Sequence, residues 1–308
     1  MNLLSELKKG LNEPKLILGK INSQYRHIFR NRGKNFNVQG IDILEQDWDN
    51  LLILDACRYD FFERYANKLP GRLSKVRSRA SATIQFLRAN FSEKELFDTV
   101  YVTANPQLFR IQNKIYEEKP INVRFHKQID IWRGNWHENH KTVLPDIVTN
   151  IALKTAANNP DKKLIIHYLQ PHAPFIGRTG VENLPTKYLN FWHPARKYVF
   201  SHEIVRRAYR ENLEIVLPHV ENLMSNLTGL TVVTSDHGEL LGDRDFPIPI
   251  RTYGHPPQNY HPSLIEVPWL EYQNGERRDI TATSPNNTDI DDNGFANIKS
   301  KLEDLGYM

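Results

Sequence analysis

The chain has 308 residues, of which 40% are hydrophobic and 25% charged. That length suits one sizeable domain, and the composition is ordinary for a soluble globular protein. The net charge of +4 is mild, and no stretch interleaves basic with aromatic residues, so no nucleic-acid partner is expected. The single cysteine, Cys57, excludes an internal disulfide and a cysteine-rich metal site.

No apolar run approaches the roughly 18 residues that a membrane-spanning helix needs. The leucines of the first eleven residues are interrupted by charged residues, so they do not form the apolar core of a signal peptide. With one cysteine, these features predict a protein that is cytoplasmic or peripheral to the inner membrane face.

Residues 1–38 are predicted to be a basic N-terminal arm or helix, because residues 1–35 hold eight Lys or Arg against two acids. One interpretation is peripheral contact with an anionic membrane. The favoured one is an arm packed on the domain, since the apolar face is short and has no Trp or Phe. Residues 39–308 are predicted to be one domain, with a polar loop near 275–294 and a closing helix over 295–305.

Leu51–Leu54 are four aliphatic residues in a row, which predicts a central strand buried on both faces. Asp55 follows at its carboxyl end, where a buried carboxylate without a partner is costly and a metal ion would remove that cost. Arg58 could bind an anionic substrate, although a salt bridge to Asp60 or Glu63 is the simpler interpretation.

A loop rich in hydroxyl groups precedes a helical pattern that runs to Phe91. Thr83 or Ser81 is therefore predicted as the N-cap of that helix. A hydroxyl at this position also lies where the helix dipole stabilises anions. Beside a metal that lowers its pKa, it would be a nucleophile toward phosphate or sulfate esters.

Strands are predicted over 99–103, 163–169 and 231–234, and helices over 144–157 and 201–227, the second kinked or broken at Pro218. His172 follows the 163–169 strand in a proline-stiffened loop, whereas His167 inside that strand is predicted to be a packed core histidine. The 231–234 strand ends in Ser235-Asp236-His237-Gly238. Asp236 and His237 there could form a metal site or a solvated turn.

Five segments of the chain contain the candidate site residues and resemble known motifs. In chain order they are L-I-L-D-A-C-R-Y-D, S-A-T-I-Q-F-L, L-Q-P-H-A-P-F, V-V-T-S-D-H-G-E-L-L-G-D and Y-G-H. Together they resemble the alkaline phosphatase and sulfatase superfamily, in particular its sulfatase-like branch. The resemblance implies an α/β fold with a mostly parallel central sheet sandwiched between helices. It also implies metal ligands at Asp55, Asp236 and His237, a nucleophile at Thr83 or Ser81 that touches the metal, and substrate or metal contacts at His172 and His255.

Two departures from the family pattern narrow this expectation. Cys57 is followed by Arg58-Tyr59-Asp60-Phe61, so the C-x-P-x-R motif that is oxidised to formylglycine in sulfatases is missing. The chain resembles instead the phosphoglycerol and phosphoethanolamine transferases, which use an unmodified hydroxyl. The loop with His172 also lacks the Asp of two-zinc phosphodiesterases, so one divalent ion is expected, with Mn²⁺, Zn²⁺, Mg²⁺ and Ca²⁺ not distinguished.

The expected function is a metal-dependent hydrolase or transferase that acts on phosphate mono- or diesters through a phospho-enzyme on Thr83 or Ser81, with Thr83 slightly favoured. The substrate would be an anionic ester such as a lipid- or glycan-linked phosphate. One alternative is a sulfatase with an atypical site. Another is a non-catalytic, metal-stabilised binding domain in surface-polymer assembly.

Overall fold

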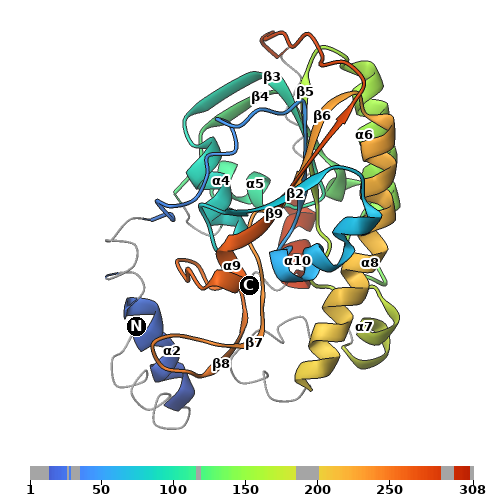
Figure 1. Ribbon diagram of the computed structural model, residues 1–308. Helices are drawn as coiled ribbons and strands as arrows, with labels where there is room; N and C mark the ends of the chain where they lie inside the picture. The colour runs from blue at the N-terminus through green and yellow to red at the C-terminus, as the bar shows by residue number, and fades with distance from the viewer. Residues whose placement is uncertain are drawn as a thin grey trace.

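The computed structural model describes residues 14–25, 28, 35–115, 119–184, 201–285 and 295–305. A seven-stranded sheet in the order β2-β9-β6-β1-β5-β3-β4 forms its centre (Figure 1). The strands are β1 (Asn50–Leu54), β2 (Arg72–Arg77), β3 (Lys94–Thr103), β4 (Val123–Asp130), β5 (Lys163–Tyr168), β6 (Gly229–Thr234) and β9 (Glu266–Asn274). Separately, β7 (Leu240–Arg244) and β8 (Arg251–Gly254) pair as an antiparallel hairpin.

The predicted mostly parallel α/β sheet is confirmed. Strand β1 runs parallel to β5 on one side and to β6 on the other, and β3 runs parallel to both β5 and β4. At one edge β9 is antiparallel to both β6 and β2, so β9 alone runs against the other strands of this sheet. The three predicted strands that follow β1 match β3, β5 and β6, although β3 is longer than expected. Strands β2, β4 and β9 and the hairpin were not predicted.

Helices cover both faces of the sheet. They are α2 (Pro14–Tyr25), α3 (Tyr59–Phe62), α4 (Thr83–Phe91), α5 (Gln107–Gln112), α6 (Pro145–Asn158), α7 (Arg178–Asn183), α8 (His202–Asn226), α9 (Pro262–Ile265) and α10 (Phe295–Asp304), with 3₁₀ turns η2 (Glu63–Lys68) and η3 (Ile131–Arg133). In Figure 1, α6 and α8 lie against one face and α4 and α5 against the other.

The central strand divides its side chains between two cores. Leu52 and Leu54 pack with residues of α6 and α8, whereas Leu51 and Ile53 pack with residues of α4 and α5. All four are fully buried. Alternate side chains of a strand point to opposite faces, so a continuous aliphatic run is what a strand covered on both faces requires.

The predicted helices are confirmed, with one correction. Helix α8 begins after Ser201, whose side chain accepts a hydrogen bond from the amide of Glu203, and it runs on through Pro218 to Asn226. The break allowed for at Pro218 is therefore wrong. Ten buried residues along α8 explain this, because burial of an amphipathic face outweighs the loss of one backbone hydrogen bond.

Both ends of the chain are described in part. Residues 1–13 of the predicted N-terminal arm, and 286–294 of the predicted polar loop, lie outside the described residues. Helix α2 contacts the loop of the β7–β8 hairpin, because the side-chain amide of Asn22 exchanges two hydrogen bonds with the backbone of Ile248, at 2.8 and 2.9 Å. The division into an arm and one domain stays a prediction.

Replacing Leu52 by Ala should lower the free energy of unfolding by about 2–4 kcal/mol, because it opens a cavity in a core that is closed on all sides. Urea unfolding followed by circular dichroism measures this loss. The matched control is Val181→Ala on α7, where the side chain is 54% exposed and the expected change is within about 0.5 kcal/mol. Equal losses for the two variants would contradict the central position of β1.

Candidate active site

The residues of the candidate site follow the carboxyl ends of three adjacent parallel strands. Because β5, β1 and β6 are neighbours and run in the same direction, their carboxyl ends open at one edge of the sheet. Asp55 directly follows β1, His172 lies four residues beyond β5, and Asp236 and His237 follow β6. All four are buried. The structure therefore brings together residues that are up to 182 positions apart in the chain.

The first cluster consists of Asp55, Asp236, His237 and Thr83. Nε2 of His237 lies 3.7 Å from Oδ1 of Asp55, 3.3 Å from Oδ2 of Asp236 and 3.2 Å from Oγ1 of Thr83. Nδ1 of His237 donates to the carbonyl of Gly238 at 2.8 Å, so Nε2 carries the lone pair. Four donor atoms held about 2.1 Å from one ion would lie about 3.4 Å apart, close to the separations found here.

The charges of this cluster fit a cation. Among the described residues, Oδ1 of Asp55 and Oδ2 of Asp236 are buried and accept no hydrogen bond. Burial, and then the neighbouring charge of Asp236, raise the pKa of Asp55 well above its usual range. Burial also lowers the pKa of His237, which favours the neutral form that binds metal. Two carboxylates, one neutral imidazole and one hydroxyl form a donor set that suits a divalent ion.

The backbone around Asp55 is fixed by other segments. Asn105, in the loop after β3, donates from Nδ2 to Oδ2 of Asp55 at 2.5 Å and thereby leaves Oδ1 facing the cluster. Ala56 has a φ of 60°, a left-handed conformation that costs a non-glycine residue about 1–2 kcal/mol. Its amide donates to Asp236 at 3.0 Å and its carbonyl accepts from Tyr209 at 2.7 Å, so both sides of the strained residue are held.

The structure separates the two candidate nucleophiles. Thr83 is the first residue of α4, whose N-cap is Ala82, so the predicted capping role of Thr83 or Ser81 is wrong. Oγ of Ser81 donates to the carbonyl of Pro256 at 3.0 Å and accepts from the amide of Asn259 at 3.1 Å. Ser81 therefore ties the loop before α4 to the segment after β8, and it is Thr83 that contacts the first cluster.

A second cluster lies beside the first and consists of His172, Glu239 and His255. Nδ1 of His255 is 3.0 Å from Oε2 of Glu239, and Nε2 of His172 is 3.9 Å from the same oxygen. Although burial alone would lower the pKa of His255, the Glu239 carboxylate raises it on balance. The His255 ring centre is 4.6 Å from that of His237, so the two clusters adjoin. His255, which the sequence placed among the metal ligands, lies in this second group.

Arg58 does not lie free for a substrate. Its guanidinium donates to Asp60 at 2.8 and 2.9 Å, to Asp243 at 2.7 Å and to the carbonyl of Glu239 at 3.0 Å. The predicted salt bridge with Asp60 is confirmed, whereas the substrate-binding role finds no support in these contacts. By holding the backbone of Glu239, Arg58 positions the second cluster.

Gly238 owes its place to close packing. A Cβ on it would overlap the carbonyl of Ser263, and its own amide donates to the carbonyl of Leu264 at 2.7 Å. The turn after His237 thus packs directly on α9, a contact that only glycine permits at this position.

Three residues to which the sequence gave no role in the site also belong to it: Glu239, Asn105 and His167. The first stood in the D-H-G-E motif without a role, and nothing in the sequence marked Asn105. His167 is buried as predicted, but its Nε2 lies 4.0 Å from Oδ2 of Asp236, and its Nδ1 is 2.8 Å from the hydroxyl of Tyr101. With Asp55 and Asp236 it forms a third possible metal-binding group.

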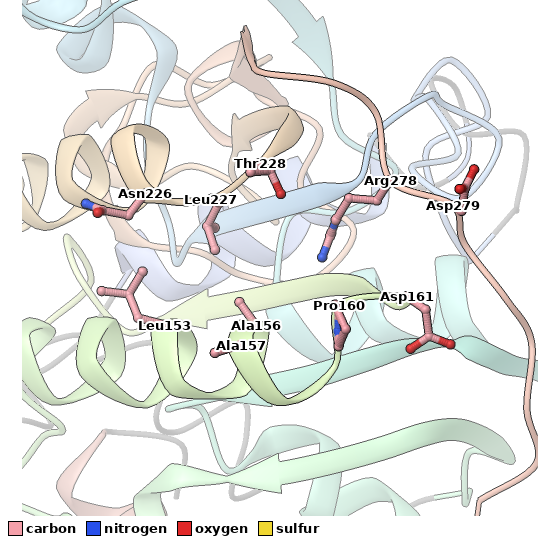
Figure 2. Close-up of a pocket in the computed structure, with 10 residues that line it drawn as sticks. All are labelled: Leu153, Ala156, Ala157, Pro160, Asp161, Asn226, Leu227, Thr228, Arg278 and Asp279. Atoms are coloured by element: carbon pink, nitrogen blue, oxygen red, sulfur yellow. The ribbon is translucent and has the colours of Figure 1, made fainter.

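A pocket of about 610 Å³ lies at the opposite edge of the sheet (Figure 2). The end of α6, the turn between α8 and β6, and Arg278 and Asp279 line it. Its lining residues Asp161 and Thr228 lie two residues and one residue before the amino ends of β5 and β6, so it is remote from the two clusters. Arg278 donates there to Asn50 and to the carbonyl of Asp49, both at 2.7 Å. The pocket is separate from the predicted site.

Neither protein-family models nor curated protein sequences give a match to this chain. Solved structures do. The integral membrane phosphoethanolamine transferase EptA of Neisseria meningitidis matches at 14% identity and a TM-score of 0.46, covering 84% of this chain and 55% of that one. The periplasmic domain of EptC of Escherichia coli, in complex with Zn, matches at 14% identity and a TM-score of 0.42. The match covers 76% of this chain and 75% of that one. A Bacteroides thetaiotaomicron protein described as a sulfatase matches at 12% identity and a TM-score of 0.42. The match covers 76% of this chain and 66% of that one.

The chain thus spans about half the length of EptA. The matched proteins are phosphoethanolamine transferases and sulfatases, the two groups that the sequence motifs resemble. At this level of similarity they assign no role to any residue. The motifs, and their position at the carboxyl ends of a mostly parallel sheet, agree with the resemblance to the alkaline phosphatase and sulfatase superfamily.

The comparison corrects the predicted location. The sequence predicted a protein that is cytoplasmic or peripheral to the inner membrane face, but the matched EptC structures of Campylobacter jejuni and Escherichia coli are C-terminal periplasmic domains. The prediction is wrong on that finding, because it rested on one cysteine and on the first residues of the sequence. Within the described ranges, no helix has both the length and the apolar composition to cross a membrane.

Asp55→Asn should raise the Tm of the metal-free protein. A carboxyl whose pKa is raised by folding costs stability at neutral pH, where the unfolded chain has it ionised, and the amide removes that cost. The same variant should lose the increase in Tm that Mn²⁺ or Zn²⁺ gives the wild type. Calorimetry with and without chelator measures both effects. Asp279→Asn, an exposed change beside the remote pocket, should keep the wild-type response. A metal response that survives in Asp55→Asn contradicts the proposed ligand set.

Proposed function

We propose that this protein is a metal-dependent phosphoryl-transfer enzyme that acts on phosphate mono- or diesters through a covalent intermediate on Thr83. One observation carries the proposal: Oγ1 of Thr83 lies 3.2 Å from Nε2 of His237, beside two buried carboxylates that each direct an unbonded oxygen into the same space. A nucleophile, a metal donor set and a helix N-terminus meet there.

A divalent ion bound by Asp55, Asp236, His237 and Thr83 would lower the pKa of the hydroxyl and offset the charge of the phosphate. Thr83 attacks phosphorus, so that the Thr83 oxygen–phosphorus bond forms while the bond to the leaving alcohol breaks. The amides in the first turn of α4 lie next to Thr83 and favour the anionic group. A second attack, by water or by an acceptor hydroxyl, returns Thr83 to its free form.

The second cluster binds the substrate in this scheme. Glu239 favours the protonated form of His255, and an imidazolium beside His237 would attract the phosphate oxygens. Burial, together with the neighbouring His255 and His237, lowers the pKa of His172, which therefore stays neutral. The residue types of this cluster would also suit a second ion. We propose one ion per chain at the first cluster, which metal titration with calorimetry tests by its stoichiometry.

Several substrate classes fit an anionic ester site. A lipid- or glycan-linked phosphate would suit the transferase form of the reaction, and a free ester the hydrolase form; the difference is whether water or an acceptor reaches the intermediate. The alternative of a sulfatase is less favoured, because the chain lacks the C-x-P-x-R motif and keeps an unmodified threonine at the cluster.

Thr83→Ala should reduce turnover at least about a thousandfold, since it removes the attacking oxygen. Three donors remain, so a metal-induced rise in Tm should persist. The matched control is Ser81→Ala, two residues earlier in the same loop, which should keep turnover within about tenfold because the Ser81 hydroxyl bonds to Pro256, Asn259 and Gln85 rather than to the first cluster. Loss of turnover in Ser81→Ala with activity retained in Thr83→Ala would reverse the assignment.

Paired aryl esters test the reaction class. With added Mn²⁺ or Zn²⁺, phosphate monoester or diester should be cleaved, and mass spectrometry of trapped enzyme should find the phosphate on a peptide that spans residues 78–88. Turnover of the aryl sulfate alone would contradict the phosphoryl-transfer proposal and support the sulfatase alternative. A metal-dependent Tm without turnover of any ester would instead support a non-catalytic binding domain in surface-polymer assembly.

A further inference from the structure

An apolar surface lies on the hairpin that connects the two halves of the second cluster. Glu239 directly precedes β7 and His255 directly follows β8. The turn between the strands, residues 246–250, reads F-P-I-P-I and contains no charged residue. Phe246 is 48% exposed there. Hairpin turns are ordinarily polar, so an exposed aromatic followed by two prolines is unusual.

Helix α2 extends this surface. Ile17 and Ile21 are one helical turn apart and are 42% and 47% exposed. Tyr25, one turn further, contacts Phe246 edge to face with ring centres 5.7 Å apart. Figure 1 shows α2 beside the β7–β8 hairpin. Together, Ile17, Ile21, Tyr25 and Phe246 form a surface that we call the apolar edge.

Half of the strongly exposed large hydrophobic residues in the described part of the chain lie in the apolar edge. There are six such residues, and three of them belong to α2 and the hairpin turn: Ile17, Ile21 and Phe246. Scattered single residues of this kind are normal, whereas a continuous group marks a contact surface. The sequence predicted an amphipathic basic helix with Leu3, Leu4, Leu7 and Leu11 on its apolar face, and those residues lie outside the described part of the chain. In the structure the exposed aromatic comes from a position 221 residues beyond Tyr25.

The distribution of charge selects the occupant. Residues 1–34 carry eight cationic and two acidic side chains, a net charge of +6, whereas residues 35–308 carry a net charge of −2. Helix α2 contains no acidic residue, and Asp245 beside the turn is buried. A second copy of the chain would bring the same positive segment against itself. An anionic surface would be attracted instead, and one with an apolar interior also accommodates isoleucine and phenylalanine side chains.

We propose that the apolar edge docks the protein on a bilayer that contains anionic lipids. Phe246 and Tyr25 then lie at the headgroup level, where amphipathic and aromatic rings are favoured. The five residues of β7 span about 15 Å, so the second cluster stands about that far from the docked turn. Docking itself does not depend on the proposed reaction.

Vesicle sedimentation with the full chain tests the docking. Binding should be stronger to phosphatidylcholine mixed with phosphatidylglycerol than to phosphatidylcholine alone, and should weaken as salt screens the charges. The triple variant Ile17→Ser, Ile21→Ser, Phe246→Ser should bind the mixed vesicles at least about tenfold more weakly, because the apolar contribution is lost. Val181→Ser on α7, where the side chain is 54% exposed, should bind as the wild type does.

Two further readouts keep a folding defect apart from a docking defect. The triple variant should keep the metal-dependent Tm of the wild type, and Phe246→Trp should show a blue-shifted emission with mixed vesicles only. Equal binding of the triple variant and the wild type, or no binding of the wild type to mixed vesicles at low salt, overturns the proposal. So does sedimentation equilibrium that shows a dimer in the wild type and a monomer in the triple variant, because the apolar edge would then join two copies of this chain.

Discussion

Two buried carboxylates that face one another, each with an oxygen that accepts no hydrogen bond, are the constraint on which this structure depends. Asp55 and Asp236 follow adjacent parallel strands, and the packing that buries β1 and β6 also removes both side chains from water. Placing two negative charges together in a protein interior is strongly unfavourable unless a cation neutralises them. The surrounding groups are arranged as if to accept that cation: His237 is held neutral with its lone pair inward, and Asn105 turns one oxygen of Asp55 toward the centre.

The second cluster depends on the same edge of the sheet but is built differently. Glu239 and His255 stand at the two ends of one hairpin, and Arg58, next to β1, holds the backbone of Glu239. Its buried ion pair with Asp243 fixes the hairpin from below. A movement of the hairpin would therefore change the second cluster while leaving Asp55, Asp236 and His237 in place. The apolar turn lies at the far end of that hairpin.

Two local features of the backbone lie beside the clusters, namely the left-handed conformation of Ala56 and the close packing of Gly238. At Gly238 the main chain passes where a Cβ would overlap Ser263, whereas Ala56 adopts a left-handed φ that is costly for a residue with a Cβ. Each lies within one residue of a cluster member. Such local cost is tolerated where the surroundings hold it in place, here through Tyr209 and Asp236 at Ala56 and through Leu264 at Gly238.

The sequence by itself determined the strands that carry the site and the identity of most donors. Aliphatic runs such as Leu51–Leu54 and Thr231–Thr234 predict buried strands because little else is compatible with such residues, and the polar residue after each run is then placed at the carboxyl edge. Only the tertiary structure shows that the hydroxyl of Thr83, and not that of Ser81, contacts the first cluster, because the two hydroxyls are two residues apart and their partners come from segments more than 150 residues away. Contacts between distant segments likewise decided the positions of Asn105, Glu239 and Arg58. They also placed Phe246 next to α2. Local periodicity reports which side of an element is buried, but not which distant side chain it meets there.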